Sequence, residues 1–211
     1  MTLSDPRFIS LNQWLNRYFS YDVTPILISG DASFRRYFRV VARDASYIVA
    51  DSPPALVPIA PFIALASGYA AAGLTVPKVI TSDAEQGFML LSDLGDTQLL
   101  SVLTDDNVAD YYRRALALLP QVASVVESLD PVTGNTQPLP LYDEAFVRRE
   151  LGIFTEWLLE RHLQLELSHE ERLLLEKSFG LLVENALAQP KVGMHRDFHS
   201  RNLMLKEGEL C

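Results

Sequence analysis

Three polar side chains near the end of the chain have a spacing that could support chemistry. His195 and Asp197 are two residues apart, and Asn202 follows five residues after Asp197. A carboxylate could orient an attacking hydroxyl group and take its proton, while an amide oxygen a few residues later could reach a metal ion that bridges phosphate oxygens. This spacing is typical of a phosphoryl-transfer loop. Chance would produce it in roughly one chain in a hundred of this size, so the rest of the chain must corroborate it.

The composition indicates a globular protein. The 211 residues are 48% hydrophobic and 9% aromatic, enough to build one large domain or two small lobes. No apolar run approaches the roughly 20 residues that cross a bilayer, and the N-terminus lacks the basic start and apolar core of a signal peptide. The single cysteine, Cys211, excludes an internal disulfide. A cytoplasmic location without a membrane partner is therefore expected.

The negative charge is concentrated in the second half of the chain. Residues 1–95 hold 7 Lys/Arg and 8 Asp/Glu, whereas residues 96–211 hold 11 and 19. An acidic half of this kind argues against nucleic acid as a partner. It would suit a cationic substrate, although a solvated acidic surface is the more common explanation.

The first half of the chain reads as a small sheet with two helices. Apolar spacing predicts an amphipathic helix from Asp5 to Phe19 and an uncharged, alanine-rich helix at 58–72 that ends at Gly73 and should pack on the sheet. Strands are predicted at 24–29, 34–41, 47–50, 76–81 and 88–91.

The segment Ser92–Asp96 is the clearest boundary, because mostly helical patterns follow it. Helices are predicted at 97–103, 105–129, 143–162 and 168–188, with a loop at 130–141. Ser168 and Glu171 form a capping box at the start of the last helix.

A small-residue turn lies between the first two strands, at Gly30-Asp31-Ala32-Ser33-Phe34. Such a turn lets backbone N–H groups approach phosphates without Cβ clashes. Alone it would be an ordinary β-turn before a basic strand. Its place in the first hairpin, upstream of the candidate loop, favours a phosphate-binding role.

Four segments resemble the aminoglycoside phosphotransferase and choline-kinase-like family, most closely its cytoplasmic kinases of the anomeric hydroxyl of N-acetylmuramate and N-acetylglucosamine. They are residues 30–39, 51–54, 87–95 and 195–204. The resemblance runs from about residue 10 to the last residue. It implies an α+β, protein-kinase-like bilobal fold, with a nucleotide-binding N-lobe at 1–95 built from a five-stranded antiparallel sheet and a helix. A partial, mostly helical C-lobe with the catalytic loop would occupy 96–211.

The resemblance also implies roles for individual residues. Asp197 would be the base and His195 would brace its loop, while Asn202 would bind Mg²⁺. Arg196 and His199 could touch phosphate or substrate, or pair with surface acids. The ATP-binding residues would be Gly30, Asp31, Ala32, Ser33, Phe34, Arg35, Arg36 and, in a hinge that meets adenine, Leu91.

A helix that begins near Asp143 resembles the acceptor-side helix of the same kinases. Glu150 and Trp157 are two helical turns apart, so both would lie on one face and could hold a sugar. A packing tryptophan and a solvated glutamate are an equally good interpretation.

The chain departs from the family pattern at two places. The third strand ends in Asp51 where protein kinases carry a lysine, and residues 55–73 contain no acid to pair with one. An aspartate there would repel a triphosphate unless a metal or an arginine, Arg35 or Arg36, mediates. Secondly, no aspartate occurs between residues 198 and 211 to supply a second metal ligand. The chain alone is expected to be weak or inactive, as a fragment or a truncated product.

The function expected is an ATP- and Mg²⁺-dependent kinase of an amino sugar, as in cell-wall sugar recycling. One alternative is a phosphotransferase of an aminoglycoside or choline-like amine. Another is a non-catalytic nucleotide-binding fragment. The sequence does not indicate an oligomeric state.

Overall fold

A computed structural model describes residues 5–28, 34–43 and 45–211. Internal contacts divide the chain into two compact units, Met1–Pro138 with Gly193–Cys211, and Leu139–Val192. The candidate loop residues, such as Asp197 and Asn202, therefore belong to the same unit as the N-terminal sheet. Glu150 and Trp157 belong to the other unit. The predicted division into lobes at residue 95 stays a prediction.

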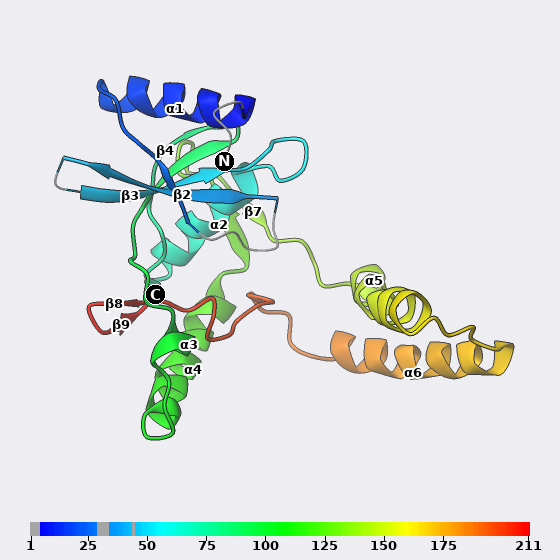
Figure 1. Cartoon of the computed structure of the whole chain (residues 1–211). Helices are drawn as coiled ribbons and strands as arrows, with labels where there is room; N and C mark the ends of the chain where they lie inside the picture. Colours follow the sequence, from blue (N-terminus) through cyan, green and yellow to red (C-terminus); the bar gives the residue numbers. More distant parts are fainter. Residues whose placement is uncertain (1–4, 29–33, 44) are drawn as a thin grey trace. The chain divides into compact units, whose positions relative to one another are not determined.

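Within the described residues, five strands form one antiparallel sheet of order β1-β2-β3-β5-β4 (Figure 1). This confirms the predicted sheet, with small shifts at strand ends. The strands are β1 (Ile26–Leu27), β2 (Arg36–Ala42), β3 (Ala45–Asp51), β4 (Val79–Asp83) and β5 (Phe88–Ser92).

Side chains alternate between two faces of this sheet, and each face carries a helix. Helix α1 (Pro6–Phe19), capped by Asp5, packs Leu11 and Leu15 against Phe38 and other fully buried residues. Helix α2 (Ala60–Ala71) packs on the opposite face, where Ala50, Met89 and Leu91 are buried. A residue on β2 or β3 therefore faces either α1 or α2, which decides what it can contact.

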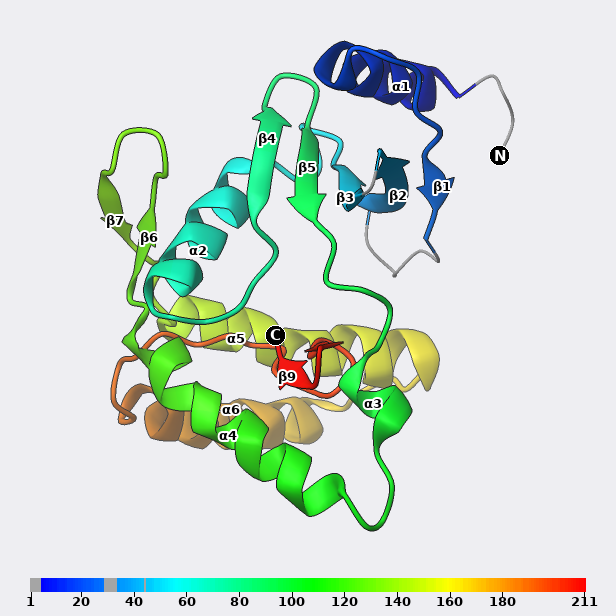
Figure 2. The ribbon, with the colours of Figure 1, turned by 90° about the vertical axis from the view of Figure 1, so that its left-hand side faces the viewer.

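Helix α2 ends as predicted, at a glycine. Gly73 has a φ of 85°, and the N–H groups of Gly73 and Leu74 donate to the carbonyls of Ala70 and Tyr69, which is a Schellman motif. The expected packing on the sheet is present, although most of the helix is only half-buried. Its other neighbour is a hairpin of β6 (Glu127–Leu129) and β7 (Thr136–Pro138) (Figure 2).

The predictions for residues 97–141 are partly wrong. Helices α3 (Leu99–Val102) and α4 (Val108–Ser124) are present, but α4 ends before Val125 and residues 127–129 form β6. The β-branched pair Val125-Val126 favours extended backbone there. Residues 136–138, predicted as loop, pair with β6 as β7. After the candidate loop, β8 (Leu205–Lys206) and β9 (Glu209–Leu210) form a hairpin.

The second unit is a helical pair, with α5 (Glu144–Ile153) beside α6 (His169–Leu187) (Figure 1). The Ser168–Glu171 capping box is confirmed. The helix predicted at 143–162 is present, but its second part, Phe154–His162, is a π-helix. An apolar spacing near 3.6 residues does not signal this wider turn. In the described part of the chain, no helix combines the length and apolarity needed to cross a membrane.

Candidate active site

The candidate loop, from Gly193 to Leu205, is anchored at both ends within its unit. At its start, the Gly193 N–H donates to the carbonyl of Ala123 at 2.9 Å. A Cβ at Gly193 would lie 2.1 Å from the Val125 carbonyl oxygen, so only glycine allows this close approach. At its end, Leu203 accepts from the Leu99 N–H and the Leu205 N–H donates to Thr97, both at 2.8 Å. Backbone hydrogen bonds therefore hold both ends of the loop in place.

Asp197 and Asn202 are brought together by this loop. The Asn202 Nδ2 amide group donates to Asp197 Oδ2 at 2.6 Å and to the Asp197 carbonyl at 3.0 Å. The Asp197 side chain is nevertheless 69% exposed. The spacing of the two residues thus leads to direct contact, with the carboxylate accessible to a ligand.

His199 holds the other oxygen of the same carboxylate. Its Nδ1 accepts from the Arg201 N–H at 3.2 Å. Its Nε2 lies 3.0 Å from Asp197 Oδ1 and 3.4 Å from Asn202 Nδ2. The structure therefore places His199 beside the candidate base.

His195 lies on the α2 side of the loop. Its ring stacks on Tyr69 with centroids 6.2 Å apart and meets the edge of Phe198 at 5.7 Å. Partial burial lowers the pKa of His195; the charge of Asp197 opposes this change and His199 adds to it. Neutral His195 fits the expected bracing role. Sequence analysis missed Tyr69, which has no pattern linking it to the loop.

Arg196 has a left-handed backbone, with φ of 71°. This conformation costs about 1–2 kcal/mol for a residue with a Cβ and essentially nothing for glycine. We expect Arg196→Val to be less stable than Arg196→Gly by about that amount, because both remove the guanidinium and differ in backbone preference. Urea unfolding of the two variants measures the difference. The same pair at Arg201 is the control and should not favour glycine; equal stability at position 196 would contradict the assignment.

Arg36 is engaged with acids and does not project freely toward a ligand. It donates to Asp51, which is fully buried, and to Asp5, while Arg7 of α1 binds the other oxygen of Asp51. Asp51 thus faces α1, and its charge is met by two arginines. The expected repulsion between Asp51 and a triphosphate is removed, because side chains alternate along β3 and Asp51 lies on the α1 face.

Arg35 faces the other side, toward α2. Its Nε donates to the Ser52 hydroxyl at 3.1 Å, and its guanidinium lies 5.1 Å from the centre of the Phe62 ring. Phe34 is 69% exposed beside it. The other predicted phosphate-binding residues, Gly30, Asp31, Ala32 and Ser33, lie outside the described residues.

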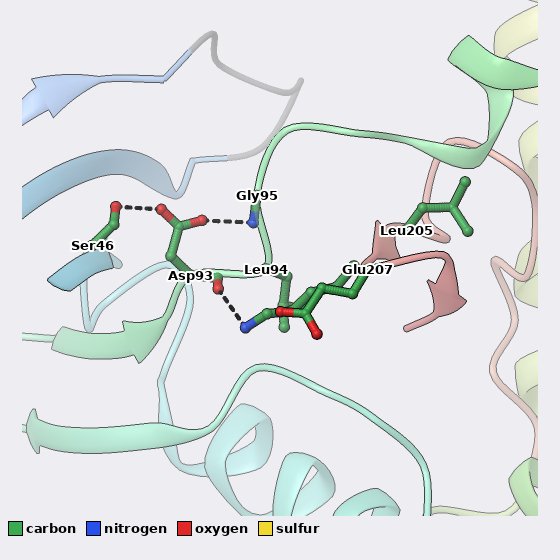
Figure 3. Close-up of a pocket in the computed structure, with 7 residues that line it drawn as sticks. Ser46, Asp93, Leu94, Gly95, Leu205 and Glu207 are labelled. Carbon is green, nitrogen blue, oxygen red and sulfur yellow. Dashed lines mark hydrogen bonds between the residues drawn. The ribbon is translucent and has the colours of Figure 1, made fainter.

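The segment after β5 makes charged and polar contacts beside a pocket of about 490 Å³ (Figure 3). Asp93 accepts from Arg39 Nε at 2.7 Å, from the Ser46 hydroxyl at 2.5 Å and from the Gly95 N–H at 2.8 Å. Burial opposes the lowering of the pKa of Asp93, but these hydrogen bonds prevail. Lys206 Nζ donates to the Asp93 carbonyl at 3.3 Å. Sequence analysis gave this segment as a boundary and as part of the family resemblance, but it assigned no contact to Arg39, Asp93 or Lys206.

Leu91 lies within the sheet and not at the pocket. Its side chain is 2% exposed, and it pairs with Ile48 of β3 and Val79 of β4. The pocket is lined from Asp93 to Gly95 and from Leu205 to Glu207. The predicted hinge role of Leu91 and its neighbours stays a prediction.

Glu150 and Trp157 have separate partners within the second unit. The Tyr142 hydroxyl donates to Glu150 at 3.0 Å, and the Arg161 guanidinium lies 4.3 Å from the centre of the Trp157 ring. Their predicted common face assumed an α-helix, and the π-helix from Phe154 turns less per residue. A sugar-binding role for the pair stays a prediction.

The loop offers the Asn202 amide oxygen to a magnesium ion, beside the Asp197 carboxylate. Because Asn202 donates through Nδ2, its Oδ1 is directed elsewhere, and Mg²⁺ prefers a few protein oxygens supplemented by phosphate and water. Among the described residues, no group of three or more His, Cys, Asp or Glu side chains is arranged to hold a metal. The residues fit a metal that completes its shell from a phosphate ligand.

Comparison with known proteins gives a consistent set of relatives. The model of a family described as APH, phosphotransferase enzyme family, matches residues 24–211. A Pseudomonas aeruginosa protein named N-acetylmuramate/N-acetylglucosamine kinase is 42% identical over 214 residues, covering 96% of this chain and 61% of its own length. A Neisseria meningitidis protein of the same name is 35% identical, with 96% and 59% covered. The chain spans about three fifths of the length of these curated relatives.

Solved structures show the same fold. The crystal structure of aminoglycoside phosphotransferase APH(4)-Ia has a TM-score of 0.61 at 14% identity, covering 96% of this chain and 69% of that one. A thermostable mutant of it, in a ternary complex with AMP-PNP and hygromycin B, has a TM-score of 0.60 at 14% identity, with 95% and 68% covered. The α+β, kinase-like fold predicted from the sequence is confirmed.

Proposed function

The chain belongs to the phosphotransferase enzyme family, and from this premise we propose that it forms the larger part of an ATP-dependent kinase acting on a hydroxyl group of an amino sugar. The observation that carries the proposal is the exposed Asp197 carboxylate, held at one oxygen by His199 and at the other by Asn202. The names of the two relatives support the amino sugar as acceptor.

The reaction follows from the position of Asp197. An acceptor hydroxyl placed against this carboxylate would be oriented toward the γ-phosphorus and would lose its proton to Asp197 as the new P–O bond forms. The bond from the γ-phosphorus to the bridging oxygen breaks, and ADP leaves. His195, neutral and stacked on Tyr69, would keep the loop in place.

Charge on the triphosphate has to be balanced during transfer. Asn202 Oδ1 would hold Mg²⁺, which when bound neutralises phosphate oxygens. Arg35, on the α2 side of the sheet, would meet the phosphates, together with the predicted phosphate-binding residues 30–33.

The test compares two proteins, this chain and an extended chain in which it is joined to the part of the Pseudomonas aeruginosa relative that it does not cover. We expect both to bind Mg·ATP. The extended chain should phosphorylate N-acetylmuramate and N-acetylglucosamine, and this chain should turn over at least about 100-fold more slowly, as for a site that lacks one metal ligand. Turnover with an aminoglycoside or choline instead would move the acceptor to the amine class. No ATP turnover with any acceptor would leave a nucleotide-binding module.

Separate substitutions of Arg35 and Arg36 distinguish a residue proposed to contact ATP from one that stabilises the fold. Arg35→Ala should raise the KM for ATP about tenfold with little change in stability, because charge-assisted phosphate contacts contribute this much. Arg36→Ala should lower the free energy of unfolding by about 2 kcal/mol, because it leaves the buried Asp51 with Arg7 alone. Steady-state kinetics of the extended chain and urea unfolding measure the two effects. The reverse assignment, with Arg36→Ala stable and weak in ATP binding, would contradict the proposal.

His199 offers a test of how Asp197 is held. His199→Leu removes the imidazole that lies 3.0 Å from Asp197 Oδ1 and should lower kcat about tenfold through misorientation of the carboxylate, with the KM for ATP little changed. His199→Gln keeps an N–H donor of similar reach and should recover most of this loss. If leucine and glutamine behave alike in the extended chain, His199 does not act through Asp197.

A further inference from the structure

Asp51, at the end of β3, joins the N-terminal helix to the start of β2. Arg7 Nε donates to Asp51 Oδ1 and Arg36 Nε to Oδ2, each at 2.9 Å, and the Nη2 atom of each guanidinium bonds the same oxygen. Arg7 also donates to the Gln86 carbonyl at 2.8 Å, and Arg36 to Asp5. Both oxygens of the carboxylate are thus occupied, one by each arginine.

The cluster of Asp5, Arg7, Arg36 and Asp51 is balanced in charge. The Asp51 side chain is completely buried, and a carboxylate in that environment is stable only when paired and hydrogen-bonded. Burial opposes the change, but the hydrogen bonds that Arg36 donates to Asp5 and Asp51 raise its pKa above the ordinary value. Losing Arg7 would leave Arg36 shared between two carboxylates.

The position of the cluster connects it to the candidate nucleotide site. Arg36 and Asp51 are the register pair at the start of β2 and the end of β3. The residue next to Arg36 is Arg35, which projects from the opposite face toward Ser52 and Phe62. Whatever fixes the backbone at Arg36 therefore fixes the point from which Arg35 projects.

Helix α1, which supplies Arg7, lies before the region that defines the family. The family match begins at residue 24, whereas α1 ends at Phe19. Asp5 both caps this helix, accepting from the Arg7 and Phe8 N–H groups, and receives Arg36. The start of α1 is thus tied to β2 by two separate carboxylates.

We infer that Arg7 is a positioning residue of the nucleotide site, acting through Asp51 and Arg36 to hold Arg35 where it meets a triphosphate. The inference rests on the proposed function, because it takes Arg35 as a phosphate contact. It assigns a role in nucleotide binding to a helix outside the family match and to an aspartate that stands where kinases carry a lysine.

The test uses this 211-residue chain and three variants. Arg7→Met removes the cation and keeps an unbranched stem over the Phe88 ring. Arg7→Lys keeps one donor to Asp51. Arg17→Met, at an exposed position in the last turn of the same helix, is the matched control. Binding of Mg·AMP-PNP is measured by calorimetry at a temperature where circular dichroism shows every variant folded, and hydrogen exchange is measured over residues 34–42.

Arg7→Met should weaken nucleotide binding about five- to twentyfold and speed exchange in residues 34–42. Arg7→Lys should fall between it and the unchanged chain, and Arg17→Met should change binding less than about twofold. A merely structural arginine would lower stability and leave the affinity of the folded protein unchanged. If Arg7→Met does not fold, the intermediate result with Arg7→Lys carries the test.

Two results would overturn the inference. One is equal nucleotide affinity of the folded Arg7 and Arg17 variants. The other applies if the unchanged chain binds no nucleotide, so that the proposed function itself fails. In that case hydrogen exchange alone decides. Unchanged exchange at residues 34–42 in Arg7→Met overturns the link between Arg7 and the backbone at Arg36. Exchange that is faster in Arg7→Met, and not in Arg17→Met, supports the link.

Discussion

Asp197→Asn is expected to reduce kcat of the extended chain by about 10³-fold. The amide has the shape of the carboxylate but cannot take the proton of the acceptor hydroxyl, and general-base catalysis typically contributes this much. The substitution also places an N–H₂ group beside His199 Nε2 or Asn202 Nδ2, which now contact the two oxygens of the carboxylate. Initial rates with saturating ATP and N-acetylmuramate measure the effect.

The control for Asp197→Asn is Asp105→Asn, at an exposed turn before α4. It removes the same charge and should leave kcat within about twofold, because exposed charges contribute little. Affinity for Mg·AMP-PNP should be similar in both variants, since Asp197 is assigned to the acceptor and not to the nucleotide. Retention of turnover by Asp197→Asn would rule out Asp197 as the base.

Gly193→Ala is expected to cost at least about 4 kcal/mol of folding free energy, a size reserved for changes that the backbone cannot accommodate. The new methyl group would stand 2.1 Å from the Val125 carbonyl oxygen and 2.6 Å from that of Val122, so the backbone has to move. Gly193 would have to move away from the end of α4, and its hydrogen bond to the Ala123 carbonyl would be lost. Urea unfolding of this chain measures the loss.

Gly180→Ala is the matched control for Gly193→Ala. Gly180 lies in α6 with no atom within 4 Å of its would-be Cβ, so alanine should raise stability by about 0.5–1 kcal/mol through helix propensity. Opposite signs at the two glycines are the expected result. A small loss at Gly193, below about 1 kcal/mol, would mean that the loop can shift without breaking its anchor.

Local patterns in the sequence were sufficient for much of the fold. Strand positions follow from apolar alternation, and the capping box at Ser168 follows from residue types three positions apart. The contact between Asp197 and Asn202 was also foreseeable, because four intervening residues form a single turn of chain. These features depend on neighbours in sequence, which a pattern can represent.

The remaining features depend on residues far apart in the chain. Arg7 and Asp51 are 44 residues apart, and nothing in either segment indicates that an N-terminal helix supplies the counter-charge of a buried strand end. Tyr69 meets His195 only because α2 and the loop belong to the same folded unit. The extended segment 127–129 is held in place because β6 pairs with β7. Such tertiary contacts override the local signal.

The short segment from Asp93 to Leu100 is bound at both ends, and this constrains how the protein can vary in length. Asp93 is attached to the sheet through Arg39, and Thr97, Leu99 and Leu100 are hydrogen-bonded to the candidate loop. Inserting one residue between Asp93 and Thr97 would break either the contact of Asp93 with Arg39 or the hydrogen bonds to the candidate loop. Insertions should instead collect at the exposed tip of the β6–β7 hairpin, where a longer connection costs little. A sequence family aligned on this chain should therefore show constant length in the first region and gaps in the second.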